Sequence, residues 1–236
     1  MSERRPGDPF EAVIFDLDGV LVDAEIWWDE VRIAFARRHD RSWTEADRAA
    51  IMGANSKGWS TLMRQRLDLP EVPRATIETE VVEAMVERYR LEGAPRIPGA
   101  VETVWRVAAE LPVAVASSGH PAVIAAALDA LGIAGVFAAV VSSDEVPVGK
   151  PAPDVYLLTA VRLGVDPERC LAVEDSLNGA LAGRAAGMAV VLVPNAAVPP
   201  AGGAREAASL VLERIDELDP RGVAAALDAG TGVSQR

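Results

Sequence analysis

Several residue types and segment types are nearly absent from this chain. Its 236 residues include one cysteine and two histidines, which leaves neither a disulfide framework nor a zinc ligand set. No apolar run approaches the roughly 18 to 20 residues that a membrane-spanning helix needs. The charged segment 1–10 also lacks the apolar centre of a signal peptide. We therefore expect a soluble, cytoplasmic protein without a membrane partner.

Positive charge is scarce too. The formal net charge is −12, and no basic stripe with interleaved aromatic residues occurs, so we expect no nucleic-acid partner. Lys57 and Lys150 are the only lysines among the 23 basic residues, so a lysine in this chain is less of a generic surface residue. The acidic sequence gives no clear interface signal, and a monomer is expected.

The chain does contain a regular series of apolar runs and helical patterns. Half of its residues are hydrophobic, enough for a large buried core. The runs predicted to be strands show little polar alternation; they are 12–15, 112–116, 138–141, 170–173, 188–193 and 210–212. The helical patterns between them are 121–131, 153–163 and 176–186. A loop is expected at 194–203 and a disordered tail at 230–236. This alternation predicts an α/β fold, with a Rossmann-like, doubly wound parallel sheet that helices cover on both faces.

Residues 24–94 have a different pattern. Only helical segments are predicted there; they are 25–39, 44–52, 57–67 and 74–91. Pro95 and the pair Pro98-Gly99 mark the return to the sheet. We therefore expect a Rossmann-like core formed by 1–23 and 95–236, with an inserted α-helical cap domain between these two parts.

Two aspartates and a glycine follow the first predicted strand. Asp16 and Asp18 are spaced i, i+2 and precede Gly19. At the carboxyl end of a parallel strand, such a pair can point into the crevice where open α/β sheets bind ligands. Two carboxylates there can hold a hard cation, or act as nucleophile and acid/base. In isolation, the same residues also suit an ordinary solvated turn.

Three further signals each come after a predicted strand. Ser117 and Ser118 offer hydroxyls and amides to phosphate oxygens at a strand-to-helix turn. Lys150 stands in a proline-stiffened loop, and Glu174 and Asp175 come just before a helix. Each signal alone also fits a capping serine, a surface lysine, or acids that favour a helix dipole. Together, acids, hydroxyls and one lysine at the same sheet edge predict phosphoryl transfer.

In their order along the chain, these motifs resemble those of the haloacid dehalogenase superfamily, in its subfamily of phosphatases and β-phosphoglucomutase-like enzymes. The matching positions are Asp16-x-Asp18, Ser117, Lys150 and Glu174-Asp175. The resemblance extends from about Phe10 to Val193 and includes a helical cap placed directly after the first motif.

The resemblance implies roles for the acidic residues. Asp16 would attack phosphorus and form an aspartyl-phosphate. Asp18 would be the general acid and base, which protonates the leaving alkoxide and then activates water. Mg²⁺ would be held by the Asp16 carboxylate, the Asp18 main-chain carbonyl and Asp175. Glu174 would orient metal-bound water.

Phosphate binding is implied for the other motif residues. Lys150 would offset the repulsion between the nucleophile and the incoming phosphate. Ser117 would hold phosphoryl oxygens together with backbone amides near Gly19 and Ser118. The presence of Asp18 argues against the carbon–halogen and phosphonate-cleaving members of the superfamily, because those enzymes do not keep an acid at this position.

Two cap segments are candidates for recognising the leaving group. One is the start of the first cap helix, with Glu25 and Trp28; the other is the loop 53–57, with Asn55 and Lys57. Each segment also fits a structural role, in helix packing or in a turn. By the resemblance, Trp28 stands where mutase-type relatives carry a histidine that helps to control the second aspartate, which counts against mutase activity.

The sequence thus predicts a Mg²⁺-dependent phosphomonoester hydrolase that acts on a small phosphorylated metabolite through an aspartyl-phosphate. One alternative is a β-phosphoglucomutase-like sugar-phosphate mutase on the same scaffold. Another is a catalytically silent scaffold that binds a phosphorylated ligand or partner. The presence of both Asp16 and Asp18 argues against the silent scaffold, since a binding module has little use for a nucleophile together with its acid/base.

Overall fold

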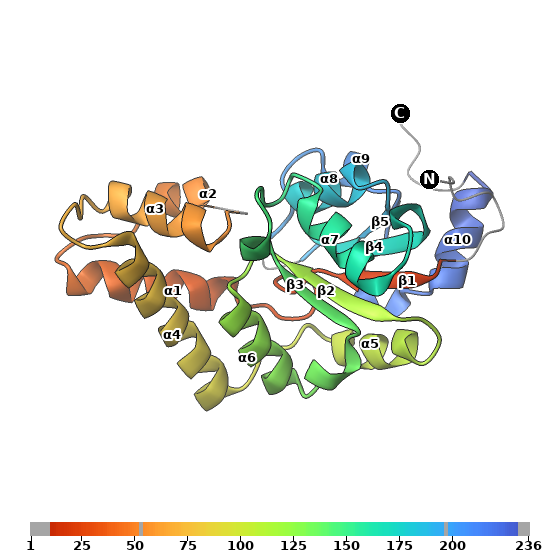
Figure 1. Ribbon diagram of the computed structural model, residues 1–236, viewed down its shortest axis with the longest axis horizontal. Coiled ribbons are helices and arrows are strands. Elements are labelled where there is room, and N and C mark those ends of the chain that lie inside the picture. Colours follow the sequence, from red (N-terminus) through yellow and green to blue (C-terminus); the bar gives the residue numbers. More distant parts are fainter. Residues whose placement is uncertain (1–9, 52–53, 196–197, 231–236) are drawn as a thin grey trace.

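Six parallel strands form the centre of the computed structural model, which describes residues 10–51, 54–195 and 198–230 (Figure 1). The strands are β1 (Ala12–Phe15), β2 (Val113–Ser117), β3 (Ala139–Ser142), β4 (Cys170–Glu174), β5 (Ala189–Leu192) and β6 (Leu210–Val211). Their order across the sheet is β3-β2-β1-β4-β5-β6, and every neighbouring pair is parallel. The predicted α/β fold with a doubly wound parallel sheet is confirmed.

The order of the strands reverses next to β1. From β1 the chain proceeds through β2 to β3 on one side, and then crosses back to continue through β4, β5 and β6 on the other. Val13 of β1 pairs with both Val113 of β2 and Leu171 of β4. A ligand crevice opens at such a reversal, outside the carboxyl ends of the strands. The residues that follow β1 and β4 therefore flank the expected binding place.

Helices cover both faces of the sheet. They are α5 (Ala100–Ala108), α6 (Pro121–Leu131), α7 (Asp154–Leu163), α8 (Leu177–Ala185), α9 (Ala204–Ala207) and α10 (Pro220–Asp228). Val13 and Phe15 pack into one apolar layer with α5, α6 and α10, whereas Ala12 and Ile14 pack into another with α7 and α8. All four side chains of β1 are fully buried. Burial on both faces explains why the strands have apolar sequences without polar alternation.

Three of these helices, α5, α9 and α10, are not among the helices expected from the sequence. In α5 the buried residues are Ala100, Thr103, Val104 and Val107, which form one stripe along the helix. The stripe is short and follows directly on the prolines that mark the return to the sheet, so it does not stand out as a separate helix in the sequence.

No helix in the described part of the chain is both long and apolar enough to cross a bilayer.

Four of the helices between β1 and β2 lie to the left of the sheet in Figure 1. They are α1 (Glu25–Arg38), α2 (Glu45–Ile51), α3 (Ser56–Arg66) and α4 (Arg74–Glu92). Phe35, Met63 and Met85 from three of them are fully buried in one apolar cluster. An inserted helical cap is thus part of the fold, and α4 runs beside the core helix α6. The expected domain limits at residues 24 and 94 stay a prediction.

The two chain segments that join the cap to the sheet lie side by side. Val22 and Arg96 form an antiparallel bridge. Next to it, the Asp23 amide donates a hydrogen bond to the Pro95 carbonyl at 2.8 Å. The cap is therefore attached through one paired crossing, which starts only a few residues after the end of β1.

Some sequence-based expectations fall outside the described residues. They concern the charged N-terminal segment 1–9, Gly53 of the candidate cap loop and the tail 231–236. The loop expected at 194–203 is described except for residues 196 and 197.

Candidate active site

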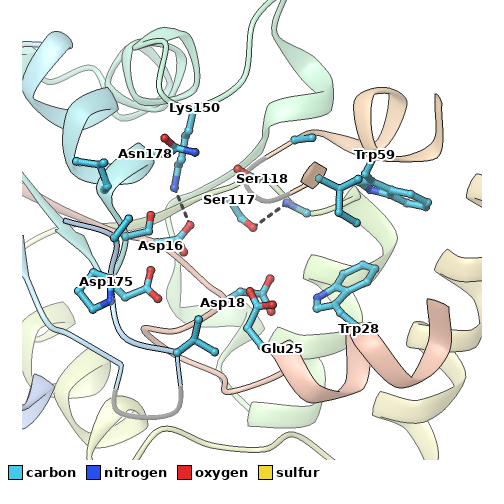
Figure 2. Close-up of a pocket in the computed structure, with 18 of the residues that line it drawn as sticks. Asp16, Asp18, Glu25, Trp28, Trp59, Ser117, Ser118, Lys150, Asp175 and Asn178 are labelled. Carbon is cyan, nitrogen blue, oxygen red and sulfur yellow. Dashed lines mark hydrogen bonds and ion pairs between the residues drawn. The ribbon is translucent and has the colours of Figure 1, made fainter. Parts of the chain in front are cut away.

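A cavity of about 380 Å³ lies between the carboxyl edge of the sheet and the cap (Figure 2). The core contributes residues at or beyond the carboxyl ends of β1, β2, β3 and β4 together with the loop 198–201, and the cap contributes parts of α1, α2 and α3. The polar and aromatic lining residues are Asp16, Asp18, Glu25, Trp28, Arg32, Trp59, Ser117, Ser118, Lys150, Asp175, Ser176 and Asn178. Most of the residues that the sequence singles out are therefore brought together in one place.

Lys150 forms hydrogen bonds to residues of β2 and β4, which lie on either side of β1, and to Asp16, which follows β1. Its ammonium donates hydrogen bonds to Asp16 Oδ1 at 2.7 Å, to the Ala116 carbonyl at 2.9 Å and to Glu174 Oε1 at 2.6 Å. Burial alone would lower the pKa of Lys150, but the ion pairs with Asp16 and Glu174 raise it overall. All three donors of the ammonium are thus satisfied, and the lysine is a fixed positive charge beside Asp16.

Glu174 is fully buried and holds Lys150 in place. Its Oε1 also accepts a hydrogen bond from the Tyr156 hydroxyl at 2.5 Å, and its Oε2 accepts one from Ser176 Oγ at 3.3 Å. A Cβ on Gly179 of α8 would meet this carboxylate at 1.9 Å, so the close approach of helix and carboxylate requires glycine there. The expected role of Glu174 in orienting metal-bound water stays a prediction. Tyr156 was not singled out from the sequence.

A cluster of carboxylate oxygens is available for a cation. Asp16, Glu174 and Asp175 can each place one oxygen within 4.8 Å of the others. Burial, followed by the charge of Asp16, raises the pKa of Asp175 well above its ordinary value. Gly19, at φ +88°, makes room for Asp175, because a Cβ there would meet Asp175 Oδ2 at 2.0 Å. Several buried acids around one lysine leave excess negative charge, and oxygen donors of this kind suit Mg²⁺.

Asp18 occupies a different environment from Asp16. Its Oδ1 is buried and has no hydrogen-bond partner among the described residues. Burial raises the pKa of Asp18 to about 8, helped by the charges of Glu25 and Asp16. The Trp28 indole and the Arg32 guanidinium act in the opposite direction. A carboxyl that keeps its proton near neutral pH is able to donate it to a leaving oxygen.

Two serines lie at the carboxyl end of β2. Ser117 is almost completely buried, and its Oγ accepts a hydrogen bond from the Gly119 amide at 3.0 Å. Ser117 and Ser118 both line the cavity that also contains Asp16 (Figure 2). The hydroxyls and amides of this turn precede α6, so they stand where an anion is favoured by a helix N-terminus.

The cap side of the cavity has an aromatic wall. Figure 2 shows Trp28 and Trp59 on this side, and their ring centroids are 6.4 Å apart. The guanidinium carbon of Arg32 lies over both rings, 4.9 Å from the centroid of Trp28 and 5.8 Å from that of Trp59. Sequence reasoning selected Trp28 and Glu25 but missed Trp59 and Arg32. The spacing of Arg32 from Trp28 and Glu25, four and seven residues, was the available signal for a shared helix face.

The other two cap candidates lie elsewhere. Asn55 caps α3, where its Oδ1 accepts a hydrogen bond from the Gly58 amide at 3.0 Å. Lys57 is exposed. Neither residue is among the lining residues of the described cavity. Their expected roles in substrate choice stay predictions, and the structure gives Asn55 a structural role at the helix start.

A doubly wound sheet of α/β class, with this acidic crevice under a helical cap, is typical of one class of hydrolytic enzymes. The chain belongs to the haloacid dehalogenase-like hydrolases, because the model of that family matches residues 10–187.

The similar proteins include phosphatases. Hexitol phosphatase B of Escherichia coli (strain K12) is 32% identical over 195 residues, which cover 78% of this chain and 83% of that protein. Fructose-1-phosphate phosphatase YqaB of the same organism is 34% identical over 199 residues, which cover 81% and 97%. A β-phosphoglucomutase structure from Clostridium difficile has a TM-score of 0.79 at 20% identity, covers 94% of this chain and 99% of its own, and shows likeness of fold. The chain is thus a phosphatase-type enzyme of this family.

Proposed function

We propose that this chain is a Mg²⁺-dependent phosphomonoester hydrolase that acts on a small sugar or polyol phosphate through an aspartyl-phosphate on Asp16. One observation carries the proposal. Asp16 and Asp18 line the same cavity two residues apart, yet Asp16 is ion-paired with Lys150 at 2.7 Å while Asp18 Oδ1 has no partner among the described residues. Two carboxyl groups in unlike environments are suited to two different roles.

In the first half-reaction, an Asp16 carboxylate oxygen attacks phosphorus and the bond from phosphorus to the ester oxygen breaks. The leaving oxygen takes its proton from Asp18, whose transfer of a proton is typically worth about 10² to 10⁴ in rate. In the second half-reaction, Asp18 removes a proton from water, and the hydroxyl attacks the same phosphorus. The bond from phosphorus to Asp16 then breaks, and inorganic phosphate leaves.

The remaining core residues neutralise and orient charge. Lys150 stays positive next to Asp16 and reduces the repulsion between the carboxylate and a phosphate dianion. Ser117 and Ser118 present hydroxyl and amide donors to the phosphoryl oxygens. Because these groups are already held in place by the fold, little reorganisation is needed when the substrate binds.

The acidic cluster fits Mg²⁺. The Asp16 carboxylate, the Asp18 main-chain carbonyl and Asp175 would hold the ion, and Glu174 is less available because Lys150, Tyr156 and Ser176 already bond to it. When bound, the ion would supply positive charge that offsets the negative charge of the transferring phosphoryl group.

The proposed substrate class rests on the relatives and on the cap. Two similar proteins are named as phosphatases of a hexitol and of fructose 1-phosphate. The indoles of Trp28 and Trp59 offer an apolar wall to the carbon chain of such a molecule, and Glu25 offers an acceptor to its hydroxyls. A mutase is not favoured, since Trp28 stands where mutase-type relatives carry a histidine. The cytoplasmic location and the monomeric state stay predictions from the sequence.

The test is phosphate release from a panel of hexose, hexitol, nucleotide and short-acid phosphates, with Mg²⁺ and with EDTA. We expect metal-dependent release, highest for a sugar or polyol phosphate. Acid quenching during turnover with a radiolabelled ester should leave label on a peptide that contains Asp16. Asp129→Asn on the exposed side of α6 is the matched control for Asp16→Asn. Metal-independent release, or full activity of Asp16→Asn, would contradict the proposal, and isomerisation of glucose 1-phosphate without net release would favour the mutase.

A further inference from the structure

The cap places an arginine inside the cavity with no hydrogen-bond or ion-pair partner among the described residues. Arg32 of α1 is only 9% exposed and lines the cavity. It forms no hydrogen bond and no ion pair with any described residue, and its Nε is buried without a partner. A guanidinium carries five N–H donors and keeps its charge, so a buried one without acceptors is costly.

The contacts that Arg32 does make leave its donors available. The two indoles lie against the guanidinium, with its carbon 4.9 Å from the ring centroid of Trp28 and 5.8 Å from that of Trp59. Such cation–π contacts attract the charge but accept no conventional hydrogen bond. Trp28 and Trp59 therefore hold the guanidinium at the cavity wall while its N–H groups await oxygen acceptors.

Nearby carboxylates do not fill this role in the structure. Glu25, Asp29 and Asp18 act on Arg32 over a distance, since their charges oppose the lowering of its pKa to about 10 that burial causes. None of the three comes within ion-pair distance of Arg32. Asp29 Oδ2 instead accepts a hydrogen bond from Arg48 at 2.5 Å.

The positions of the cap side chains suggest what the acceptor is. Glu25, Trp28 and Arg32 are spaced three, four and seven residues apart, so they form one stripe of α1 that faces the cavity. Glu25 lies at the end near Asp18, as Figure 2 shows. Arg32 is seven residues, or about two helical turns, farther along α1. A molecule whose ester phosphate lies at Asp16 would therefore meet Glu25 first, then the indole, and Arg32 at its far end.

We propose that Arg32 selects substrates that carry a second anionic group, a carboxylate or a phosphate, at the end of the carbon chain remote from the ester phosphate. The proposal rests on the proposed hydrolase function and specifies its substrate class: a phosphorylated sugar acid or a sugar bisphosphate. Both groups present paired oxygens that match the fork of donors on a guanidinium. Arg32 is therefore a specificity residue that contacts the far end of the substrate, whereas the core residues Asp16 and Asp18 act on the ester phosphate.

Two matched pairs of esters test the proposal with the Mg²⁺-loaded wild-type enzyme. Glucitol 6-phosphate and 6-phosphogluconate differ at the far end by an alcohol against a carboxylate. Fructose 1-phosphate and fructose 1,6-bisphosphate differ there by an alcohol against a phosphate. We expect kcat/KM to be about ten- to a hundredfold higher for the diacidic member of at least one pair, as charged hydrogen bonds supply. The pair that shows the preference identifies which anion is recognised.

Variants then assign the preference to Arg32. Arg32→Gln should reduce the ratio of kcat/KM within that pair at least tenfold, mainly through KM of the diacidic ester. Arg32→Lys keeps a charge but loses the planar fork, so it should give an intermediate ratio. Arg37→Gln, exposed on the same helix, is the control and should leave the ratio unchanged.

Three outcomes would overturn the proposal, and they differ from failure of the hydrolase function. Wild-type ratios at or below one in both pairs would show that no second anion is recognised. An unchanged ratio in Arg32→Gln, accompanied by a lower free energy of unfolding, would make Arg32 a structural partner of Asp29. If Arg32→Gln does not fold, an unchanged ratio in Arg32→Lys decides against it. Failure of the hydrolase function appears differently, as no Mg²⁺-dependent release from any ester.

Discussion

Lys150 and Arg32 are both buried cations in the same cavity, and they differ in how many of their hydrogen-bond donors have acceptors. Lys150, on the core side, donates to three oxygens at 2.6 to 2.9 Å. Arg32, on the cap side, donates to none of the described residues. A buried cation whose donors are all satisfied is part of the folded framework. One whose donors are free is suited to a ligand that comes and goes. The comparison separates Lys150, which serves folding and the reaction, from Arg32, which we propose serves substrate selection.

The surroundings of the two cations follow the same division. Lys150 is surrounded by Asp16, Glu174 and the Tyr156 ring, which all come from the sheet or its covering helices. Arg32 is surrounded by Trp28 and Trp59 of the cap. Aromatic rings hold a charge in position while leaving its hydrogen-bonding capacity unused, which is the condition for a recognition site.

Asp16→Asn should have the largest effect on activity. The change removes the nucleophilic charge and one ion-pair partner of Lys150, so turnover should fall by about 10³-fold or more. Phosphate release with the preferred ester and Mg²⁺ is the measurement. Binding of the ester, followed by calorimetry, should persist, because the cap side is unaltered. Loss of binding together with turnover would show that the two sides of the cavity are not separable.

Lys150→Met should have the largest effect on stability. It leaves the buried Asp16 and Glu174 without a counter-charge, so the free energy of unfolding in EDTA should fall by about 3 to 5 kcal/mol. Urea denaturation checks this. Lys57→Met, at the exposed lysine, is the matched control and should stay within about 0.5 kcal/mol of wild type. An equal loss in the two variants would remove the distinction drawn for Lys150.

Arg32→Met should act in the opposite direction on stability. Replacing a buried charge that lacks hydrogen-bond partners by an apolar side chain of similar length should raise the free energy of unfolding by about 1 kcal/mol. The measurement is the same urea denaturation without ligand, with the exposed Arg37→Met as control. A loss of more than about 1 kcal/mol would mean that Arg32 stabilises the fold and is not held for a ligand.

Tyr156→Phe should have the smallest effect. The change removes one hydrogen bond to Glu174 but keeps the ring under Lys150, so the free energy of unfolding should fall by about 1 kcal/mol. Activity should fall less than in Lys150→Met, since Glu174 still holds the lysine. A fall in activity as large as that of Lys150→Met would show that Tyr156 acts on the reaction itself.

The sheet and the core motifs were predictable from the sequence for a physical reason. Strands buried on both faces have continuous apolar runs, and β1 begins at Ala12 and ends at Phe15 as expected. Polar residues that directly follow such runs must lie at one edge of a parallel sheet, which is where Asp16, Ser117 and Asp175 are found. In these segments the local sequence determines both the strand and the place of the polar residues that follow it.

The missed residues lack that coupling. Arg32 lies among other charged residues of α1. Its spacing from Glu25 and Trp28 places it on their helix face, but the packing of the cap decides that this face turns toward the cavity and not toward solvent. Tyr156 looks like an ordinary helix residue until α7 is placed against the sheet and its hydroxyl reaches Glu174. Asn55, a candidate for substrate choice from the sequence, has its side-chain oxygen engaged in a helix cap, and only the structure shows this contact. Such assignments depend on contacts between elements far apart in the chain.

The paired crossing at Val22 and Arg96 has a consequence for how such enzymes can diversify. The two chain segments that join the cap to the core lie antiparallel at this bridge, a spacing that a turn of two residues can close. Glu25, Trp28 and Arg32 therefore all belong to a single insert, while Asp16 and Lys150 lie outside it. Recombination at this junction would exchange the whole cap wall of the cavity at once and leave Asp16 and Lys150 in place.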